Sequence, residues 1–256
     1  MLRRSQEWQS KASGNKIEKC NICGAEINFD LRRPIENLRE EEICPYCHAI
    51  MRYLDMAQVL LYKSSISLQM SIKEALPIFN DMYIYELAHG GSINMVLSTT
   101  PHHTTSEFFD DVKPGQYHAS GIRCENVQAL TFTDNIFDYV ISQDVFEHVP
   151  DFIQGFKEIK RVLKPGGYHL FTVPYHNNAA KSVVRAKVEN GKIKYLLKPM
   201  YHGDPIRPGG ALVFVDYGLD LGEMLVEIGF NIEIYESVYN TPNGGYNVVF
   251  CAQKLA

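Results

Sequence analysis

The sequence lacks three features that would each place it in a particular class of protein. No apolar run approaches the roughly 18–20 residues needed to cross a bilayer, so no membrane-spanning helix is predicted. Lys and Arg total 25 against 30 Asp and Glu, without a basic stripe, which disfavours binding to nucleic acid through its phosphates. The basic N-terminus is not followed by an apolar stretch, so no secretory signal is predicted and we expect a cytoplasmic location.

The rest of the composition is that of a folded protein. With 45% hydrophobic and 21% charged residues, wholesale disorder is not expected. A chain of 256 residues is long enough for one substantial core and a small appendage. Its six cysteines do not indicate disulfides, because a chain of this size needs no covalent staples and four of the six fall in paired short spacings.

Those four cysteines form two Cys-x-x-Cys pairs: Cys20 with Cys23, and Cys44 with Cys47. A gap of two residues lets both thiolates of a turn face a common centre, and two such turns complete the tetrahedral sulfur shell that Zn²⁺ prefers. The alternative is a pair of redox motifs, but these favour a helix N-terminus beside a βαβ pattern, and the intervening segment is polar. Four protein ligands leave no open position, so we predict a structural zinc with His48 in a supporting or surface role.

The remainder of the chain alternates predicted strands and helices. Apolar periodicity broken by Pro77 predicts one or two helices over 52–79. Strands are predicted near 82–87, 103–108, 121–127, 137–142, 168–173, 232–238 and 246–253, and helices over 92–97, 151–163 and 219–228. The turn at 241–245 joins the last two strands and makes the final one antiparallel. Repeated βα units predict an α/β fold with a doubly wound, mainly parallel sheet and helices on both faces.

Polar residues follow four of the predicted strands. In an open parallel sheet, ligands bind beyond the carboxyl ends of the strands, where the strand order reverses. The residues in such positions are Glu86 and Gly90, then Glu107, Asn126 and the run Ser142-Gln143-Asp144. A glycine lets the backbone approach a ligand, a carboxylate accepts hydrogen bonds from a ribose diol, and an asparagine both donates to and accepts from an adenine edge. The pattern therefore favours a nucleoside-containing ligand.

Two stretches carry a family resemblance. Residues 130–151, Leu-Thr-Phe-Thr-Asp-Asn-Ile-Phe-Asp-Tyr-Val-Ile-Ser-Gln-Asp-Val-Phe-Glu-His-Val-Pro-Asp, and residues 156–167, Phe-Lys-Glu-Ile-Lys-Arg-Val-Leu-Lys-Pro-Gly-Gly, resemble class I S-adenosylmethionine-dependent methyltransferases. The resemblance covers about 84–254. It implies a Rossmann-like methyltransferase fold with a seven-stranded sheet, S-adenosylmethionine as cofactor, and methyl transfer to an O or N nucleophile. The cysteine module followed by a helix resembles a subgroup of methyltransferase-like proteins with a zinc-ribbon-like module.

The resemblance also assigns residues by position. Contacts to the cofactor are implied for Glu86, Ala88, Gly90, Glu107, Asn126, Val127 and Gln143. Ala88 stands where the family most often has glycine, and alanine replaces glycine readily only at negative φ, so cofactor binding depends on the φ that this residue adopts. A general base is needed only if the acceptor must lose a proton, and His202, His176 and His148 are the candidates.

Residues 177–210 read as an insertion that covers the acceptor. An Asn190-Gly191 turn predicts a hairpin over 183–197, and the following segment would bring Tyr201, His202 and Asp204 over the reacting centre. The alternative is a decorative hairpin or a dimer contact. The acceptor, whether a small molecule or a protein, is not identified by the sequence.

The predicted organisation is a zinc module over 1–52, a helical connector over 53–80 and a methyltransferase-like domain over 81–256. Three other functions each agree with part of the sequence. The first is a non-catalytic binding protein on a degenerate methyltransferase fold, which is favoured by the alanine at position 88 in place of the usual glycine. An NAD-dependent oxidoreductase would suit Glu107, about twenty residues after Glu86, but Gly-x-Gly-x-x-Gly is absent. RNA methylation is disfavoured by the acidic balance.

Overall fold

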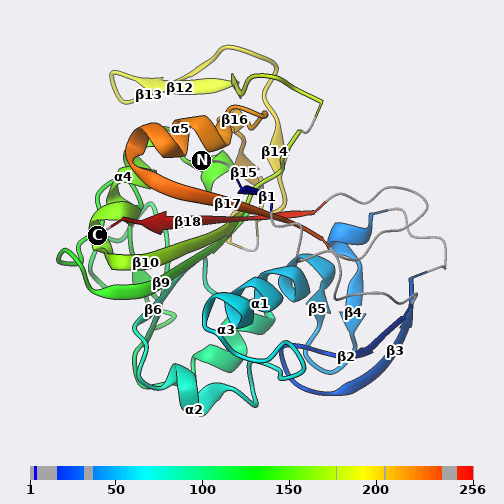
Figure 1. The fold of residues 1–256 in the computed structure, drawn as a ribbon. Helices are drawn as coiled ribbons and strands as arrows, with labels where there is room; N and C mark the ends of the chain where they lie inside the picture. Colours follow the sequence, from blue (N-terminus) through cyan, green and yellow to red (C-terminus); the bar gives the residue numbers. More distant parts are fainter. Residues whose placement is uncertain are drawn as a thin grey trace.

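A central β-sheet with helices on both faces organises the structure, a computed structural model that describes residues 3–4, 16–31, 37–176, 178–204, 206–237 and 247–255. The sheet strands are β1 (Arg3–Arg4), β6 (Ile84–Leu87), β7 (His103–Glu107), β8 (Arg123–Cys124), β9 (Phe137–Gln143), β10 (Leu163–Thr172), β17 (Phe230–Glu236) and β18 (Val248–Lys254). Their order is β1-β17-β18-β10-β9-β6-β7-β8 (Figure 1). The predicted turn at 241–245 lies outside the described residues.

The sheet is parallel except at β18, which is antiparallel to both β10 and β17. Without the short edge strand β1, the eight-stranded sheet has the seven strands that the family resemblance implied. The predicted antiparallel final strand is therefore confirmed. Strand order runs in one direction from β6 through β7 to β8, and in the other from β6 through β9 to β10.

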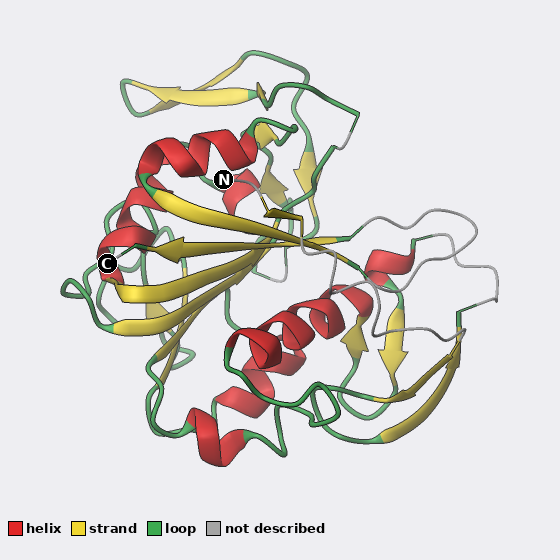
Figure 2. Ribbon diagram, viewed as in Figure 1, coloured by secondary structure: helices red, strands yellow, loops and turns green. Residues whose placement is uncertain are grey.

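Five helices accompany the sheet in the described part of the chain (Figure 2). They are α1 (Met51–Lys63), α2 (Leu76–Phe79), α3 (Gly91–Leu97), α4 (Phe152–Val162) and α5 (Leu221–Ile228). In α4 the apolar residues recur at helical spacing, so Phe156, Ile159 and Val162 are all buried on one face. Asp151 caps its N-terminus by accepting a hydrogen bond from the Gln154 N–H.

The two faces of the sheet have separate cores. Helices α4 and α5 bury one face, in a cluster that includes Val140, Phe171 and Phe250. Helices α1 and α3 bury the other face, in a cluster that includes Ile141 and Leu170. Figure 1 shows the two helix pairs on opposite sides of the sheet.

The N-terminal cysteine segment belongs to the second of these cores. It comprises β2 (Lys16–Lys19), β3 (Glu26–Asp30), the 3-10 turn η1 (Leu38–Glu40), β4 (Glu42–Cys44) and β5 (Ala49–Ile50). Helix α1 follows directly and packs against β5, η1, β10 and β18. One continuous buried cluster therefore runs from Ile17 through α1 to Cys251 in the sheet.

The insertion after β10 is built from short antiparallel pairs. These are β11 (Val183–Val184) with β16 (Val215–Asp216), β12 (Ala186–Glu189) with β13 (Lys192–Tyr195), and β14 (Tyr201–His202) with β15 (Ala211–Leu212). The hairpin predicted on Asn190-Gly191 is confirmed, with both residues in the left-handed region at φ 51° and 72°. Among the described helices, none is both long and apolar enough to span a membrane.

Candidate functional site

The carboxyl ends of β6, β7 and β9 form the edge at which the strand order reverses. Open α/β sheets bind their ligands at such an edge. Pairing aligns Glu86 of β6 with Thr105 of β7 and with Ile141 of β9, so the residues that follow these strands emerge side by side. The predicted residues Glu107 and Gln143 are the last residues of β7 and β9.

Glu86 is held inside the sheet edge. Its Oε2 accepts a hydrogen bond of 3.2 Å from Asn94 Nδ2, and His103 Nε2 lies 3.2 Å from the same oxygen. Burial raises the pKa of the Glu86 carboxyl, against the opposing effect of the His103 contact. The carboxylate therefore ties α3 to the strands and fixes the start of the turn that follows β6.

The turn from β6 into α3 has a positive φ at three of the four positions from 88 to 91. Ala88 has φ 66°, Gly90 has φ 110° and Gly91 has φ 82°. Ala88 therefore adopts a positive φ, and the chain makes the same sharp turn that glycine would allow. A Cβ on Gly91 would lie 2.9 Å from the Tyr53 ring, so that position requires glycine. Ala88 is exposed and its Cβ is tolerated at a cost of about 1–2 kcal/mol.

Replacing Ala88 with glycine should raise the free energy of unfolding by about 0.5–1 kcal/mol. The substitution removes left-handed strain of about 1–2 kcal/mol and adds back about 0.4–1 kcal/mol of unfolded-chain entropy. Urea denaturation followed by circular dichroism measures the difference. The control is Ala119→Gly, at an exposed alanine outside the positive-φ set, which should lower stability instead. A loss of stability in Ala88→Gly would contradict the left-handed assignment.

Glu107 and Gln143 offer acceptors at the same edge. The Glu107 Oε1 accepts the Phe108 N–H at 3.0 Å, and burial raises the pKa of this half-buried carboxyl. Gln143 Oε1 is buried and has no hydrogen-bond partner among the described residues. A buried amide oxygen without a donor is costly, which fits a group that bonds to a ligand.

Asn126 and Val127 follow β8, next to β7 in the sheet. Asn126 Oδ1 accepts from the backbone N–H of Gln128 at 3.0 Å and from its Nε2 at 3.2 Å. That oxygen is therefore engaged in shaping the turn. Val127 is buried and lies in contact with Gly155 of α4. The structure thus brings both residues to the predicted edge.

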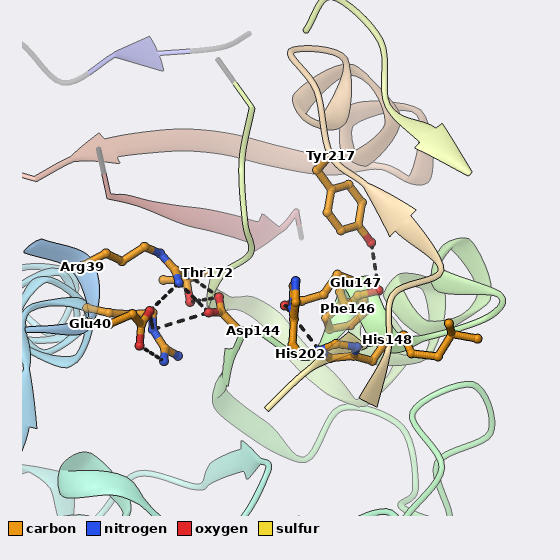
Figure 3. A network of polar contacts seen from close by, with 11 residues as sticks. Arg39, Glu40, Asp144, Phe146, Glu147, His148, Thr172, His202 and Tyr217 are labelled. Carbon is orange, nitrogen blue, oxygen red and sulfur yellow. Dashed lines mark hydrogen bonds and ion pairs between the residues drawn. The ribbon is translucent and has the colours of Figure 1, made fainter. Parts of the chain in front are cut away.

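The N-terminal cysteine module reaches over this edge (Figure 3). Arg39 donates to both carboxylate oxygens of Asp144, which directly follows β9, and its Nη1 is 2.6 Å from Oδ2. Thr172 at the end of β10 donates to Asp144 Oδ1 at 3.0 Å, and Arg52 Nε lies 3.5 Å from Oδ2. Burial opposes ionisation of Asp144, yet the hydrogen bonds and charges of the two arginines hold its pKa below the usual value. This network joins the module to the sheet edge.

A second polar cluster lies beside that network. Glu147 and His148 are in the 3-10 turn η2 (Phe146–His148), and His202 is in β14 of the insertion. The Glu147 Oε1 lies 3.6 Å from His148 Nε2 and 3.5 Å from His202 Nδ1 (Figure 3). We call these three residues the Glu-His-His cluster. Two of the three predicted histidines thus meet at the sheet edge.

Two other residues predicted for this region, His176 and Asp204, do not join the Glu-His-His cluster. His176 is exposed and stands outside the Glu-His-His cluster. Asp204 does not orient His202, because its carboxylate binds Arg207 Nη1 at 2.8 Å and accepts the Ile206 N–H at 2.7 Å. The acid beside His202 is Glu147, so that part of the prediction is wrong.

The insertion is anchored at two points across the edge. On one side the Phe214 N–H donates to the Glu147 carbonyl at 2.7 Å, and the Tyr217 hydroxyl donates to the Phe146 carbonyl at 3.1 Å. On the other side Arg207 Nη2 donates to the Phe108 carbonyl at 2.8 Å, next to Glu107. The segment between these points therefore spans the edge from β9 to β7.

The four predicted cysteine ligands converge on one point. Cys20 Sγ lies 3.7 Å from Cys47 Sγ, and Cys23 Sγ lies 3.7 Å from Cys44 Sγ. All four sulfurs lie within 4.8 Å of one another. A tetrahedral zinc with Zn–S bonds of about 2.3 Å separates its sulfurs by about 3.8 Å, so the donor set and its spacing fit this ion.

The residues after each second cysteine explain how the two turns form. Gly24 has φ 79° and His48 has φ 56°, so both turns reverse through a left-handed residue. The Gly24 N–H donates to the Cys20 carbonyl at 2.9 Å. His48 is exposed, with Nδ1 3.3 Å from Glu42 Oε2, as expected for a surface role.

Arg39 was not predicted from the sequence, and neither were the contacts that Asp144 and Glu147 make. Arg39 and Asp144 are 105 positions apart, and no local pattern links them. Glu147 stands directly before the candidate base His148, and the sequence left open whether it acts in catalysis or in structural hydrogen bonding.

Comparison with known proteins finds a family that the central strands match. Residues 84–171 match the family described as Methyltransferase domain. A demethylmenaquinone methyltransferase of Bacillus pumilus is 43% identical over 56 residues, which are 22% of this chain and 24% of that protein. A glycine/sarcosine/dimethylglycine N-methyltransferase of Actinopolyspora halophila is 40% identical over 67 residues, 26% of this chain and 12% of that protein. The matches thus span about a quarter of these relatives or less.

A similar solved structure is an S-adenosylmethionine-dependent methyltransferase from Mesorhizobium loti. It is 16% identical, with a TM-score of 0.44, over 70% of this chain and 95% of that chain. The family match begins at β6 and ends within β10, and so contains the strands whose carboxyl ends carry Glu86, Glu107 and Gln143. Over residues 84–171, about a third of its length, the chain matches the methyltransferase domain family.

Proposed function

We propose that the protein transfers a methyl group from S-adenosylmethionine to an O or N nucleophile of an acceptor bound at the carboxyl edge of β6, β7 and β9. One observation carries the proposal. The family match covers the strands whose ends present Glu107 and the unpartnered Gln143 oxygen at the point where strand order reverses. The argument for a non-catalytic protein rested on Ala88, and it loses its basis because the turn keeps a left-handed φ of 66°.

The residues of the edge suit the parts of this cofactor. Glu107 would accept hydrogen bonds from the ribose hydroxyls, and the glycine turn after β6 lets the backbone approach the methionine part. Asn126 and Val127 would face the adenine, and Gln143 would bond a polar group of the cofactor. The cofactor supplies a methyl group on a positively charged sulfur, and its transfer breaks the carbon–sulfur bond and leaves a neutral thioether.

Enclosure of the edge supports the placement of the acceptor. The insertion crosses the edge from Glu147 to Phe108, and the Arg39–Asp144 pair brings the cysteine module over the same strands. Such cover holds the reactants in line and excludes bulk water, and orientation alone contributes about 7–11 kcal/mol to lowering a barrier. The acceptor then lies beside the Glu-His-His cluster.

We also propose that Cys20, Cys23, Cys44 and Cys47 hold one structural Zn²⁺. The support is the set of four sulfurs within 4.8 Å of one another and the two separations of 3.7 Å. Four thiolates fill the tetrahedral shell and leave no position for a substrate. The ion would therefore stabilise the module that carries Arg39 rather than take part in the reaction.

Replacing Glu107 with alanine should weaken binding of S-adenosylhomocysteine about tenfold to a hundredfold. Hydrogen bonds to a charged group contribute about 1.5–3 kcal/mol, and each 1.4 kcal/mol corresponds to a factor of ten in affinity. Isothermal titration calorimetry measures this change directly and needs no acceptor.

The matched control is Asp111→Ala, which removes an exposed carboxylate four positions further along the chain. It should leave the affinity unchanged. Absence of S-adenosylhomocysteine binding by the wild-type protein would overturn the proposed function, and equal affinity of Glu107→Ala and wild type would overturn the role of Glu107.

A further inference from the structure

The carboxylate of Glu147 is buried without a hydrogen-bond donor. The residue is 1% exposed, and neither Oε1 nor Oε2 has a hydrogen-bond partner among the described residues. The nearby hydroxyl of Tyr217 is engaged elsewhere, since it donates to the Phe146 carbonyl. A buried carboxylate in this state is costly unless a positive charge compensates it.

The hydrogen bond of His148 fixes which of its ring nitrogens faces Glu147. Its Nδ1 lies 2.9 Å from the Leu212 carbonyl, which only accepts hydrogen bonds, so Nδ1 carries a proton. In the neutral ring, Nε2 is then an unprotonated lone pair, and this nitrogen is the one 3.6 Å from Glu147 Oε1. Metal-binding histidines commonly donate the other ring N–H to a backbone carbonyl, which orients the ring.

His202 completes the set from another part of the chain. Its Nδ1 lies 3.5 Å from the same Glu147 oxygen, and all three donor atoms of the cluster lie within 4.8 Å of one another. The two imidazole rings are nearly perpendicular, at 88°. A tetrahedral ion with bonds of about 2.0–2.1 Å separates its ligand atoms by about 3.3 Å. The two separations from Glu147 Oε1, 3.6 and 3.5 Å, are within a few tenths of an ångström of that value.

From this geometry we infer that Glu147, His148 and His202 form a second metal site, for a divalent first-row transition ion. Two imidazoles and one carboxylate are the donors that such ions as Zn²⁺, Fe²⁺ or Co²⁺ prefer, in contrast to the four thiolates of the N-terminal module. The positive charge of the ion neutralises the Glu147 carboxylate, and the lone pair of His148 Nε2 coordinates the ion.

The site has room for a further ligand. The side chains of His202 and His148 are 34% and 19% exposed, while Glu147 is closed off behind them. Three protein ligands with an accessible side are the pattern of a metal that binds substrate or water. The inference of a metal does not depend on the proposed function, but the role that follows does.

In that role the ion binds an ionisable oxygen of the acceptor, such as a phenol, enol or hydroxyl. Coordination lowers the pKa of the oxygen, and its proton passes to water. The resulting oxyanion forms the new O–C bond to the methyl carbon while the C–S bond breaks, so charge is conserved. The site thereby selects oxygen nucleophiles among the acceptors allowed by the proposed function.

Cobalt titration tests the metal site without cofactor or acceptor. Tag-free protein retaining its cysteine-bound zinc is washed with a mild chelator and titrated with Co²⁺. Wild type should gain one cobalt per chain with visible d–d absorption but no thiolate charge-transfer band. Both Glu147→Gln and His202→Ala should weaken cobalt binding by more than about a hundredfold. Loss of a residue that only hydrogen-bonds to a metal ligand already costs about tenfold to a hundredfold in affinity.

His176→Ala, at an exposed histidine outside the cluster, is the control and should bind cobalt like wild type. Circular dichroism and S-adenosylhomocysteine binding show whether each variant is folded. If Glu147→Gln does not fold, His202→Ala still tests the site, because His202 is partly exposed. The metal site would be overturned if cobalt bound only with thiolate bands, or if both variants bound cobalt as tightly as wild type. Loss of turnover in His202→Ala without any metal binding in wild type would make His202 a base instead.

Discussion

Replacing Cys20 with serine should unfold one whole face of the protein rather than the N-terminal segment alone. The buried cluster that holds Cys20 continues through Leu54 and Leu60 of α1 to Leu170 and Cys251 in the sheet. Structural zinc contributes about 10–16 kcal/mol in small zinc modules, as much as the 5–15 kcal/mol that stabilises a typical protein. We expect zinc content to fall from one per chain to near zero, together with loss of the cooperative thermal transition.

Metal analysis by mass spectrometry and hydrogen exchange of α1, β10 and β18 measure these two effects. The control is Cys124→Ser, at a buried cysteine outside the four-sulfur cluster whose Sγ donates to the Val112 carbonyl at 3.1 Å. Serine keeps this donor, so zinc content should not change. Protection lost only over residues 16–50 in Cys20→Ser would show that the module unfolds independently of the sheet.

Replacing Asp55 with asparagine should stabilise the protein by about 2–4 kcal/mol above pH 7 and much less at pH 4. Asp55 is 3% exposed on α1, and burial raises its pKa to about 7, against hydrogen bonds from Asn247 and Ser237. The unfolded carboxyl titrates near 3.9. Between these values the unfolded state loses its proton first, so wild-type stability from this group is full below about pH 4 and is lost as pH rises through 7.

The neighbouring amide can adapt to the substitution. Asp55 Oδ2 accepts from Asn247 Nδ2 at 2.6 Å, while Asn247 Oδ1 is buried and unpartnered among the described residues. Turning the Asn247 amide over would let the new asparagine donate to that oxygen. Urea denaturation of wild type and Asp55→Asn from pH 4 to pH 8 measures the effect, with exposed Asp81→Asn as control. Equal stability differences at both ends of this range would contradict a raised pKa.

Local patterns in the sequence predicted the features that depend on local physics. The paired cysteine spacing located all four sulfurs of the N-terminal cluster, and apolar periodicity located α4 with its Asp151 cap. The Asn-Gly turn located the β12–β13 hairpin. Each of these features depends on a few neighbouring residues, so it can be predicted from the sequence alone.

Contacts between distant segments could not be predicted from local sequence patterns. The Arg39–Asp144 pair and the Glu147–His202 contact join segments 105 and 55 positions apart, and they depend on how the module and the insertion pack on the sheet edge. Ala88 shows a different limit. Its preference for negative φ was overruled by the turn geometry that β6 and α3 impose, at a cost smaller than the gain from their packing.

The position of β18 has a consequence for the order of events during synthesis. This strand, the last one described along the sequence, lies inside the sheet between β10 and β17. Until residues 248–254 leave the ribosome, β10 and β17 each present an unpaired edge, and the apolar face of α1 has only part of its partner surface. The nascent chain therefore exposes an open sheet edge until these residues emerge, a state that favours pairing with other chains.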